Sequence, residues 1–248
     1  MPKSIQALNG NTLKIIALLI MTADHIGMII FPGVRVLRII GRLAMPIFAF
    51  MIAEGCYYTH NKPRYFLRVF VVGAVFQLLL FIFRRSLYQF ILITFSISIL
   101  LIYMLQKMND VYAQKRNAAG KMLWTCGTVF AVAAAAFICT GLPSLFPETD
   151  LAIDYGIFGV LLPVFVYIPN FFANRESELF RPFQLLFEAA GILLLTAVFG
   201  RIEAWALLSL ILLFLYNGKR GKLNIKYFFY LYFPLHLGLL YFIEAFML

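Results

Sequence analysis

The run LKIIALLIMTADHIGMIIF, residues 13–31, is apolar along almost its whole length. Wound as an α-helix at 1.5 Å per residue, it would span about 28 Å, close to the roughly 30 Å hydrocarbon core of a bilayer. Its ionisable side chains are Lys14, Asp24 and His25. No small-residue cleavage site follows, so we expect the run to remain in the protein as a transmembrane helix and not to be removed as a signal peptide.

Similar runs recur along the chain. Hydrophobic residues make up 63% of the 248 positions and charged residues 13%, a balance that no water-soluble core accommodates. The runs are too long for barrel strands and lack their alternation. We therefore predict an all-α integral membrane protein of about nine transmembrane helices, forming one polytopic domain over residues 1–248 in the cytoplasmic membrane. After the first, the predicted helices cover residues 36–57, 65–83, 87–106, 122–141, 153–172, 181–199, 201–217 and 226–247.

Basic residues indicate how these helices are oriented. With nine crossings, the N-terminal side carries 15 of the 21 Lys and Arg residues, and the opposite side carries 6. Cytoplasmic loops are enriched in Lys and Arg, so we predict a cytoplasmic N-terminus and an external C-terminus. The formal net charge of +10 arises in short loops at the membrane edge. Insertion and anionic lipid explain such charges, and we expect no nucleic-acid partner.

Cysteine spacing excludes two further classes of site. Cys56, Cys126 and Cys139 lie in apolar runs without paired spacing. This arrangement predicts neither a disulfide framework nor a metal site. We interpret the three residues as buried structural thiols.

Ionisable side chains inside the predicted helices are the functional candidates. Each costs roughly 2.5–3.5 kcal/mol at the centre of a membrane helix on insertion scales, so each position that keeps one requires an explanation. A helix that only filled the bilayer would have no use for them. The candidates are Asp24, His25, Arg42, Glu54, Asp154, Glu188 and His236.

Two histidines are predicted to lie at one depth. Lys14 and His25 are eleven positions apart, a turn of about 1100° that leaves them within about 20° of one helical face. His25 then lies roughly 16 Å deeper than Lys14, and His236, ten positions after Lys226, lies roughly 15 Å deep. We expect the two imidazoles to line one cavity and to have a catalytic or proton-handling role. Tyr232 precedes His236 by one turn, which allows its hydroxyl to contact the imidazole, and aromatic packing is the alternative role for the tyrosines of this segment.

The second predicted helix carries a basic stripe at its outer end. Arg35, Arg38 and Arg42 follow one another at three- and four-residue spacing. We interpret Arg35 and Arg38 as snorkelling to lipid headgroups, and Arg42 as a deeper, functional cation. Pro46 predicts a kink or an opening of this helix beside a cavity.

Three acids complete the candidates. Asp24 points about 100° away from His25, so we expect no direct pair between them within one helix. Glu54 lies about one turn inside the cytoplasmic end of its helix, where a buried acid requires a cationic partner. Asp154 begins the predicted helix over 153–172, a position that suits both helix capping and a role in the site.

Four segments carry a family resemblance: LKIIALLIMTADHIG (13–27), RIIGRLAMPIFAFMIAEGCYYTHNKPRYFLR (38–68), DYGIFGVLL (154–162) and KYFFYLYFPLHLGLLY (226–241). They resemble the TraX family, whose namesake is the conjugative F-pilin acetylase. That family is similar to a wider group of transmembrane acyltransferases, which includes the acyltransferase-3 proteins and the heparan glucosaminide N-acetyltransferases. Acyltransferase-3 proteins share a basic residue, ten further residues and a histidine in their first helix. Lys14 and His25 have this spacing, with lysine in place of the commoner arginine.

The resemblance implies transfer of an acetyl group from cytoplasmic acetyl-CoA to an acceptor in or across the membrane. The acceptor is expected to be a peptide amine, a small amine or a hydroxyl group. His25 is then the general base. The other catalytic candidates are Asp24, His236, Asp154 and Glu54.

Further residues are implied to bind the substrate or the donor. The candidates for stabilising the oxyanion or positioning the substrate are Arg42, Tyr155 and Tyr232. Coenzyme A carries phosphates that require cations at the cytoplasmic face. The cations expected to supply them are Lys14, Lys62, Arg64, Arg68 and Lys226.

A proton-coupled secondary transporter is the alternative. In such a protein the same intramembrane Asp, Glu and His residues form a proton relay. Transporters of this kind often have repeated halves with interrupted helices, and no such repeat is evident in this sequence. A non-catalytic scaffold explains the apolar runs but gives no reason for His25 and His236.

Overall fold

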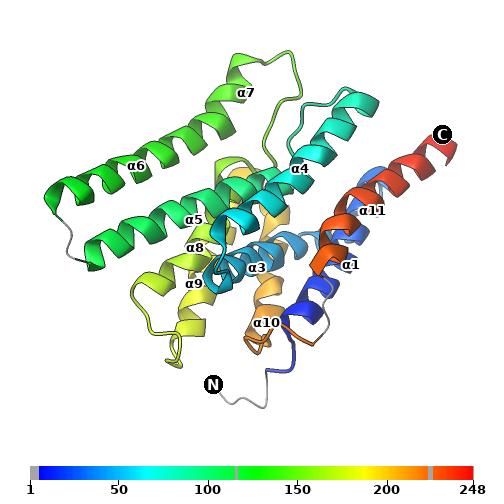
Figure 1. Ribbon diagram of the computed structural model, residues 1–248. Coiled ribbons are helices and arrows are strands. Elements are labelled where there is room, and N and C mark those ends of the chain that lie inside the picture. Colours follow the sequence, from blue (N-terminus) through cyan, green and yellow to red (C-terminus); the bar gives the residue numbers. More distant parts are fainter. Residues whose placement is uncertain (1–5, 115–116, 223–225, 248) are drawn as a thin grey trace. The chain divides into compact units, whose positions relative to one another are not determined.

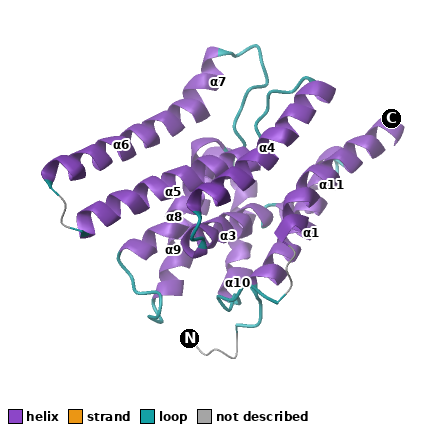
Figure 2. Ribbon diagram, viewed as in Figure 1, coloured by secondary structure: helices purple, strands orange, loops and turns teal. Residues whose placement is uncertain are grey.

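The computed structural model describes residues 6–114, 117–222 and 226–247, and its regular structure is helical (Figure 1). No strand forms among these residues (Figure 2), although Leu8 bridges Tyr216 and Gln89 bridges Ile153. The predicted all-α fold is confirmed. The chain divides into two compact units, Met1–Met51 with Asn174–Leu248 and Ile52–Ala173, called unit 1 and unit 2.

Unit 1 combines the two ends of the chain. Within it, α1 packs against α2 and α11, and α9 packs against the 3₁₀ helix η3 and against α10. The elements are α1 (Gly10–Ile29), α2 (Arg35–Gly41), the first half of α3 (Ala44–Tyr58), α9 (Phe180–Phe199), η3 (Arg201–Leu208), α10 (Ser209–Phe214) and α11 (Lys226–Met247).

Unit 2 is built around α5, which packs against α4, α6 and α8. Besides the end of α3, its elements are α4 (Lys62–Arg84), α5 (Ile91–Ala113), α6 (Ala118–Ala136), the π helix η1 (Phe137–Gly141), α7 (Leu142–Leu145), α8 (Gly156–Tyr167) and the 3₁₀ helix η2 (Ile168–Phe171). The loop before α5 is bonded to the loop before α8. There Ser86 Oγ, at 2.6 Å, and the backbone N–H of Leu87, at 2.8 Å, donate to Asp150 and hold the pKa of this carboxyl below its ordinary value.

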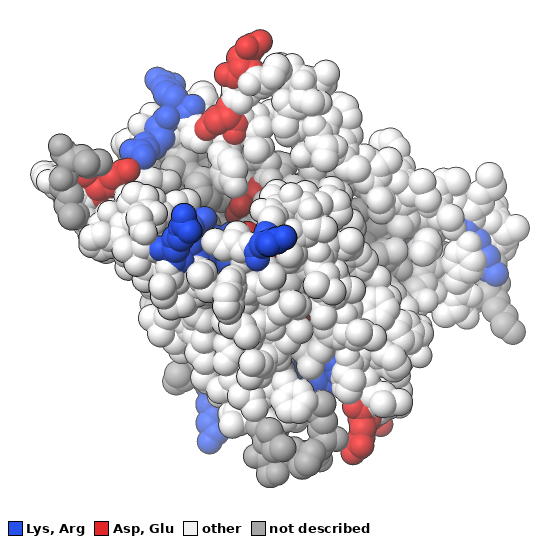
Figure 3. Space-filling view, turned by 180° about the vertical axis from the view of Figure 1, so that it is seen from behind, with Lys and Arg blue, Asp and Glu red and all other residues white. Residues whose placement is uncertain are grey.

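Six helical segments among the described residues are long and apolar enough to cross a bilayer. They are Gly10–Ile29, Arg35–Tyr58, Lys62–Arg84, Ile91–Ala113, Ala118–Leu145 and Phe180–Phe199. Each coincides with a predicted run, and two shorter apolar helices lie within the predicted runs 153–172 and 226–247. These are the lengths and compositions of a multi-pass membrane protein, and the face in Figure 3 is largely free of charged residues. The count of nine, the single domain and the cytoplasmic N-terminus stay predictions.

The prediction of one continuous transmembrane α-helix over residues 201–217 is wrong. Its first part is the 3₁₀ helix η3, and the α-helical part, α10, has only 6 residues. Gly200, with φ of 99°, ends α9 and leads directly into η3. A 3₁₀ stretch longer than a turn is uncommon, and such stretches often mark functional segments. This one carries the buried Glu203.

Pro46 explains why α2 and α3 are separate helices. A proline ring collides with the carbonyl group four residues earlier, here that of Arg42, and provides no N–H. The chain instead forms tighter hydrogen bonds, from Arg42 N to Ile39 O (3.2 Å) and from Leu43 N to Ile40 O (3.1 Å). The expected interruption is therefore present, and Arg42 stands at it.

Two glycines let α1 and α2 approach closely. A β-carbon at Gly27 would lie 2.6 Å from Cβ of Leu37, and one at Gly41 would overlap the side chain of Asp24. Small residues at such crossings allow membrane helices to pack backbone to backbone. Gly41 thus leaves the space that Asp24 occupies.

We expect Gly41→Ala to destabilise the protein by about 1–3 kcal/mol, because the added methyl group displaces the Asp24 side chain. Gly238→Ala is the matched control, since no described atom lies within 4 Å of its added carbon and alanine favours the helix. Thermal unfolding of the detergent-solubilised variants measures both. Equal melting temperatures would contradict the close packing of α1 on α2.

Candidate active site

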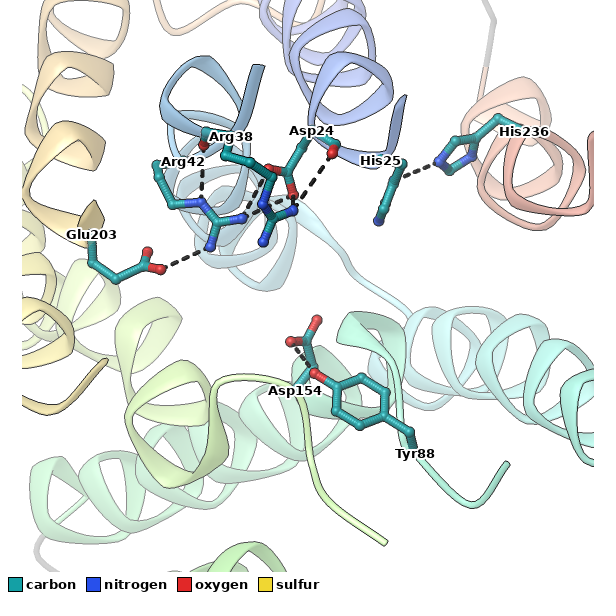
Figure 4. A network of polar contacts seen from close by, with 8 residues as sticks. All are labelled: Asp24, His25, Arg38, Arg42, Tyr88, Asp154, Glu203 and His236. Carbon is teal, nitrogen blue, oxygen red and sulfur yellow. Dashed lines mark hydrogen bonds and ion pairs between the residues drawn. The ribbon is translucent and has the colours of Figure 1, made fainter. Parts of the chain in front are cut away.

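Two histidines from the two ends of the chain meet in unit 1 (Figure 4). His25 lies on α1 and His236 on α11, and Nδ1 of His25 is 2.9 Å from Nε2 of His236. Their ring centroids are 5.0 Å apart. The two imidazoles selected from the sequence are therefore in direct contact.

A second hydrogen bond fixes the direction of this contact. Nδ1 of His236 lies 3.0 Å from the backbone carbonyl oxygen of Tyr232, which only accepts hydrogen bonds. Nδ1 therefore carries the proton of neutral His236, and Nε2 of His236 accepts from Nδ1 of His25. Neutral His25 is left with an unprotonated Nε2, which points away from His236 in Figure 4. The pair has the arrangement of a base that is oriented by a second group.

The hydroxyl of Tyr232 has a different partner from the one predicted. It lies 2.7 Å from Oγ1 of Thr22, which donates its own proton to the carbonyl oxygen of Leu18 at 2.8 Å. Tyr232 therefore donates to Thr22, and its ring stacks on His236 with the centroids 5.2 Å apart. The contact between hydroxyl and imidazole does not form. Tyr232 instead packs on His236 through its ring and accepts from it through its carbonyl group, in agreement with the packing alternative.

A groove of about 250 Å³ runs beside the histidine pair. Its lining residues are Thr22, Tyr232, Leu235, His236, Leu239 and Leu240. Leu235 and Leu239 are 60% and 59% exposed, so the groove opens along α11. Its walls are mainly apolar, which suits a short acyl group next to an imidazole.

A second polar cluster surrounds Arg42, whose side chain is only 8% exposed. Its Nη2 lies 2.9 Å from both carboxylate oxygens of Asp24, and its Nη1 lies 2.8 Å from Oε1 of Glu203. Its Nε donates to the carbonyl oxygen of Arg38 at 3.2 Å. All three guanidinium nitrogens are therefore engaged, and two carboxylates balance the buried charge.

Asp24 also binds Arg38. Nη1 of Arg38 lies 2.9 Å from Oδ2 of Asp24 and 3.5 Å from its backbone carbonyl oxygen. The interpretation of Arg38 as a residue that snorkels to headgroups is therefore wrong. Asp24 faces α2 while its neighbour His25 faces α11, in agreement with the predicted angle of about 100° between them.

Glu203 is a site residue that the sequence analysis missed. It falls inside the predicted run over 201–217, so the rule that selected Arg42, an ionisable group within an apolar run, would also have found it. Glu188, which that rule did select, is fully buried on α9. Neither of its carboxyl oxygens has a hydrogen-bond partner among the described residues, an environment that suits an uncharged group.

The predicted cations belong to both units. In unit 1, Nζ of Lys14 lies 5.5 Å from the centre of the Phe229 ring, so Lys14 and His25 both face α11. In unit 2, the first two turns of α4 carry Lys62, Arg64 and Arg68. The side chain of Lys226 lies outside the described part of the chain. Binding of coenzyme A phosphates by these residues stays a prediction.

Three other predicted residues lie in unit 2. Tyr88 donates to Oδ1 of Asp154 at 2.7 Å, and Thr94 donates to the carbonyl oxygen of Asp154 at 2.9 Å. The N-cap of α8 is Tyr155, at the left-handed φ of 56°, so Asp154 is not the capping residue. Glu54 is buried on α3. Roles for these three in catalysis stay predictions, and no described cluster of His, Cys, Asp and Glu could hold a metal ion.

Comparison with known proteins finds one matching family and two similar proteins. The family model for the TraX protein matches residues 9–244. An uncharacterised protein of Rickettsia prowazekii (strain Madrid E) is 39% identical over 66 residues, which cover 27% of this chain and only 25% of that protein. A probable fimbrial assembly protein, FimC of serogroup H1, from Dichelobacter nodosus is 24% identical in an alignment 252 positions long that covers 92% of each protein. No solved structure is significantly similar.

Glu203→Gln should destabilise the protein by about 1.5–3 kcal/mol, because Arg42 keeps its charge and loses one of its two carboxylates. Glu188→Gln is the matched control, since it makes the same chemical change in unit 1 at a carboxyl group without a hydrogen bond in the described structure. Thermal unfolding in detergent compares the two. If Glu203→Gln unfolds no earlier than Glu188→Gln, the ion pair does not contribute to stability.

Proposed function

The chain belongs to the TraX family, and we propose that it is a membrane-embedded acetyltransferase that takes its acetyl group from cytoplasmic acetyl-CoA. The namesake of the family is an acetylase of F-pilin. The observation that supports the reaction most directly is the oriented histidine pair, in which His236 accepts from Nδ1 of His25 and leaves Nε2 of His25 unprotonated. A general base requires such a nitrogen.

In the proposed reaction, a neutral amine of the acceptor attacks the carbonyl carbon of the thioester. A carbon–nitrogen bond forms, and the proton of the amine passes to Nε2 of His25. The carbon–sulfur bond then breaks, and His25 returns the proton to the sulfur of coenzyme A. The products are an amide and a free thiol. His236 holds the Nδ1–H of His25 throughout and stabilises the imidazolium that forms between the two steps.

Basic residues support binding of the donor. Lys14 lies near the start of α1, on the face that carries His25. We assign the phosphates of coenzyme A to the cations of unit 1, Lys14 and Lys226, since such contacts require positive charge at the cytoplasmic face. The acetyl group then extends from that face toward His25.

A peptide amine is the acceptor we favour. The Dichelobacter nodosus relative is named for fimbrial assembly, and the family's namesake acetylates a pilin. Both concern protein subunits of surface fibres. A small amine or a hydroxyl group is the alternative acceptor, and the same base serves both because each nucleophile loses a proton on attack.

His25→Ala should lower the rate of acetyl transfer by about 10²-fold or more, since it removes the base. The assay uses protein in lipid vesicles with acetyl-CoA and acceptor peptides, and it follows the released thiol and the acetyl mass gained by the peptide. His60→Ala, an exposed histidine in the loop before α4, is the matched control and should keep full activity. If a folded His25→Ala variant transfers acetyl groups as fast as the unmodified protein, His25 is not the general base.

Two substitutions at His236 test its orienting role. The amide oxygen of His236→Gln accepts from Nδ1 of His25, and His236→Leu offers no acceptor. We therefore expect the leucine variant to turn over at least about 10²-fold more slowly than the unmodified protein, and the glutamine variant to retain much more activity. Equal rates for the two folded variants would show that His236 does not orient His25.

A further inference from the structure

An accessible stripe of mainly apolar residues runs along α5 in unit 2. The helix packs against α4 and α6, and its residues 94–96, 98, 99, 101 and 102 are buried. The members of the stripe are accessible and follow one another at spacings of three and four, which places them on one face of the helix. They are Ile93, Ile97, Leu100, Met104 and Lys107. The stripe is therefore apolar at four positions and ends in a cation.

Two lysines lie at this end of the stripe, each over an aromatic ring of a neighbouring helix. Nζ of Lys107 is 5.9 Å from the centre of the Trp124 ring on α6. Nζ of Lys62, on α4, is 5.4 Å from the centre of the Tyr103 ring on α5. Tyr103 and Lys107 are four positions apart on α5, which corresponds to about 40° of turn and about 6 Å of rise. Lys62 and Lys107 therefore approach the same end of the stripe.

No acid balances these two charges directly. Neither lysine has an ion pair among the described residues, and Asp110, one turn beyond Lys107 on α5, pairs with neither of them. An ammonium group has three N–H donors, and a ring beside it accepts none of them as a carboxylate would. Two cations thus lie near one another on an apolar surface, where an anionic ligand lowers their energy.

The position along the membrane indicates the kind of anion. Lys107 directly follows the apolar run 87–106, and Lys62 lies three positions before the run 65–83, so both cations belong at the level of the lipid headgroups. Tyrosine and tryptophan side chains are typical of this level. The stripe extends from there into the hydrocarbon layer, where Leu100 is 45% exposed. A phospholipid supplies both an anion and an apolar chain, whereas a soluble phosphate compound has no group for the stripe.

We propose that this end of α5 binds an anionic phospholipid, with its phosphate between Lys62 and Lys107 and an acyl chain along Leu100 and Met104. The ammonium groups donate charge-assisted hydrogen bonds to the phosphate oxygens. A zwitterionic lipid carries a cation beside its phosphate and is attracted less, so the site prefers anionic headgroups. The site lies within unit 2 and does not depend on the proposed acetyl transfer. Lys62 is then a ligand of the lipid and not of the acyl donor.

Trp124 reports directly on this site. The chain has two tryptophans, so Trp205→Phe leaves Trp124 as the only one in every protein compared. The proteins are placed in vesicles of phosphatidylglycerol and phosphatidylcholine in which one of the two lipids has brominated acyl chains, and bromine quenches tryptophan fluorescence on contact. We expect phosphatidylglycerol to occupy the place beside Trp124 about tenfold or more in preference to phosphatidylcholine, because two lysines attract it.

Paired substitutions assign this preference to the two lysines. Lys62→Gln combined with Lys107→Gln should make the two lipids quench equally, whereas Lys62→Arg combined with Lys107→Arg keeps both charges and should keep the preference. Lys121→Gln is the matched control and should also keep it. Nζ of Lys121 lies 5.4 Å from the centre of the Tyr112 ring. Tyr112 follows Tyr103 by nine positions, about 900° of turn, and so lies on the opposite side of α5.

Four results would overturn the proposal. Equal quenching by the two lipids when all lysines are present excludes a preference for the anionic headgroup, whether or not the variants fold. An undiminished preference in the folded double glutamine variant assigns it to other residues, and an equal loss in Lys121→Gln assigns it to general surface charge. Displacement of phosphatidylglycerol by an excess of coenzyme A or inorganic phosphate assigns the lysines to a soluble phosphate compound. None of these measurements requires acetyl transfer, so their failure and that of the proposed function are separate.

Discussion

Burying the charge of Arg42 is the constraint on which the arrangement of unit 1 depends. Pro46 interrupts the helix at this residue. The guanidinium group of Arg42 is buried inside an apolar protein. A lone cation there is costly, so the fold brings carboxylates to it from two other elements, Asp24 on α1 and Glu203 on η3. These bonds connect the consecutive helices α1 and α2 to η3, where Glu203 lies 161 residues after Arg42. The unusual 3₁₀ winding of η3 occurs in the segment that delivers Glu203.

The ion pairs also set the position of the histidines. Asp24 and His25 are adjacent on α1, so their side chains diverge by about 100°. With Asp24 held against α2 by Arg42 and Arg38, His25 faces α11, where His236 meets it. A shift of Asp24 would therefore rotate or slide His25 as well. The close approach at Gly41 belongs to the same arrangement, since a larger residue would occupy the space of Asp24.

Apolar length and helical rise predicted most of the helices and the meeting of His25 with His236. The long runs became helices, and the common face of Lys14 and His25 became the face toward α11. Partners between helices were harder to predict, because the choice of carboxylate by an arginine depends on tertiary packing. Arg42 was correctly judged to be buried, yet its nitrogens are committed to Asp24 and Glu203. For the same reason Arg38 was assigned to the headgroups although it binds Asp24.

Charge balance allows these ionisable residues to be buried in an apolar protein. The two cations and two carboxylates of Arg38, Arg42, Asp24 and Glu203 cancel, and a neutral histidine pair adds no charge. In the proposed reaction a positive charge appears on His25 at the moment a negative charge appears on the carbonyl oxygen. The new charges are therefore opposite in sign and close together, and the imidazolium meets a group already oriented toward it, His236. In surroundings of low polarity this pairing lowers the energy of the intermediate more than water would, because no solvent has to reorganise.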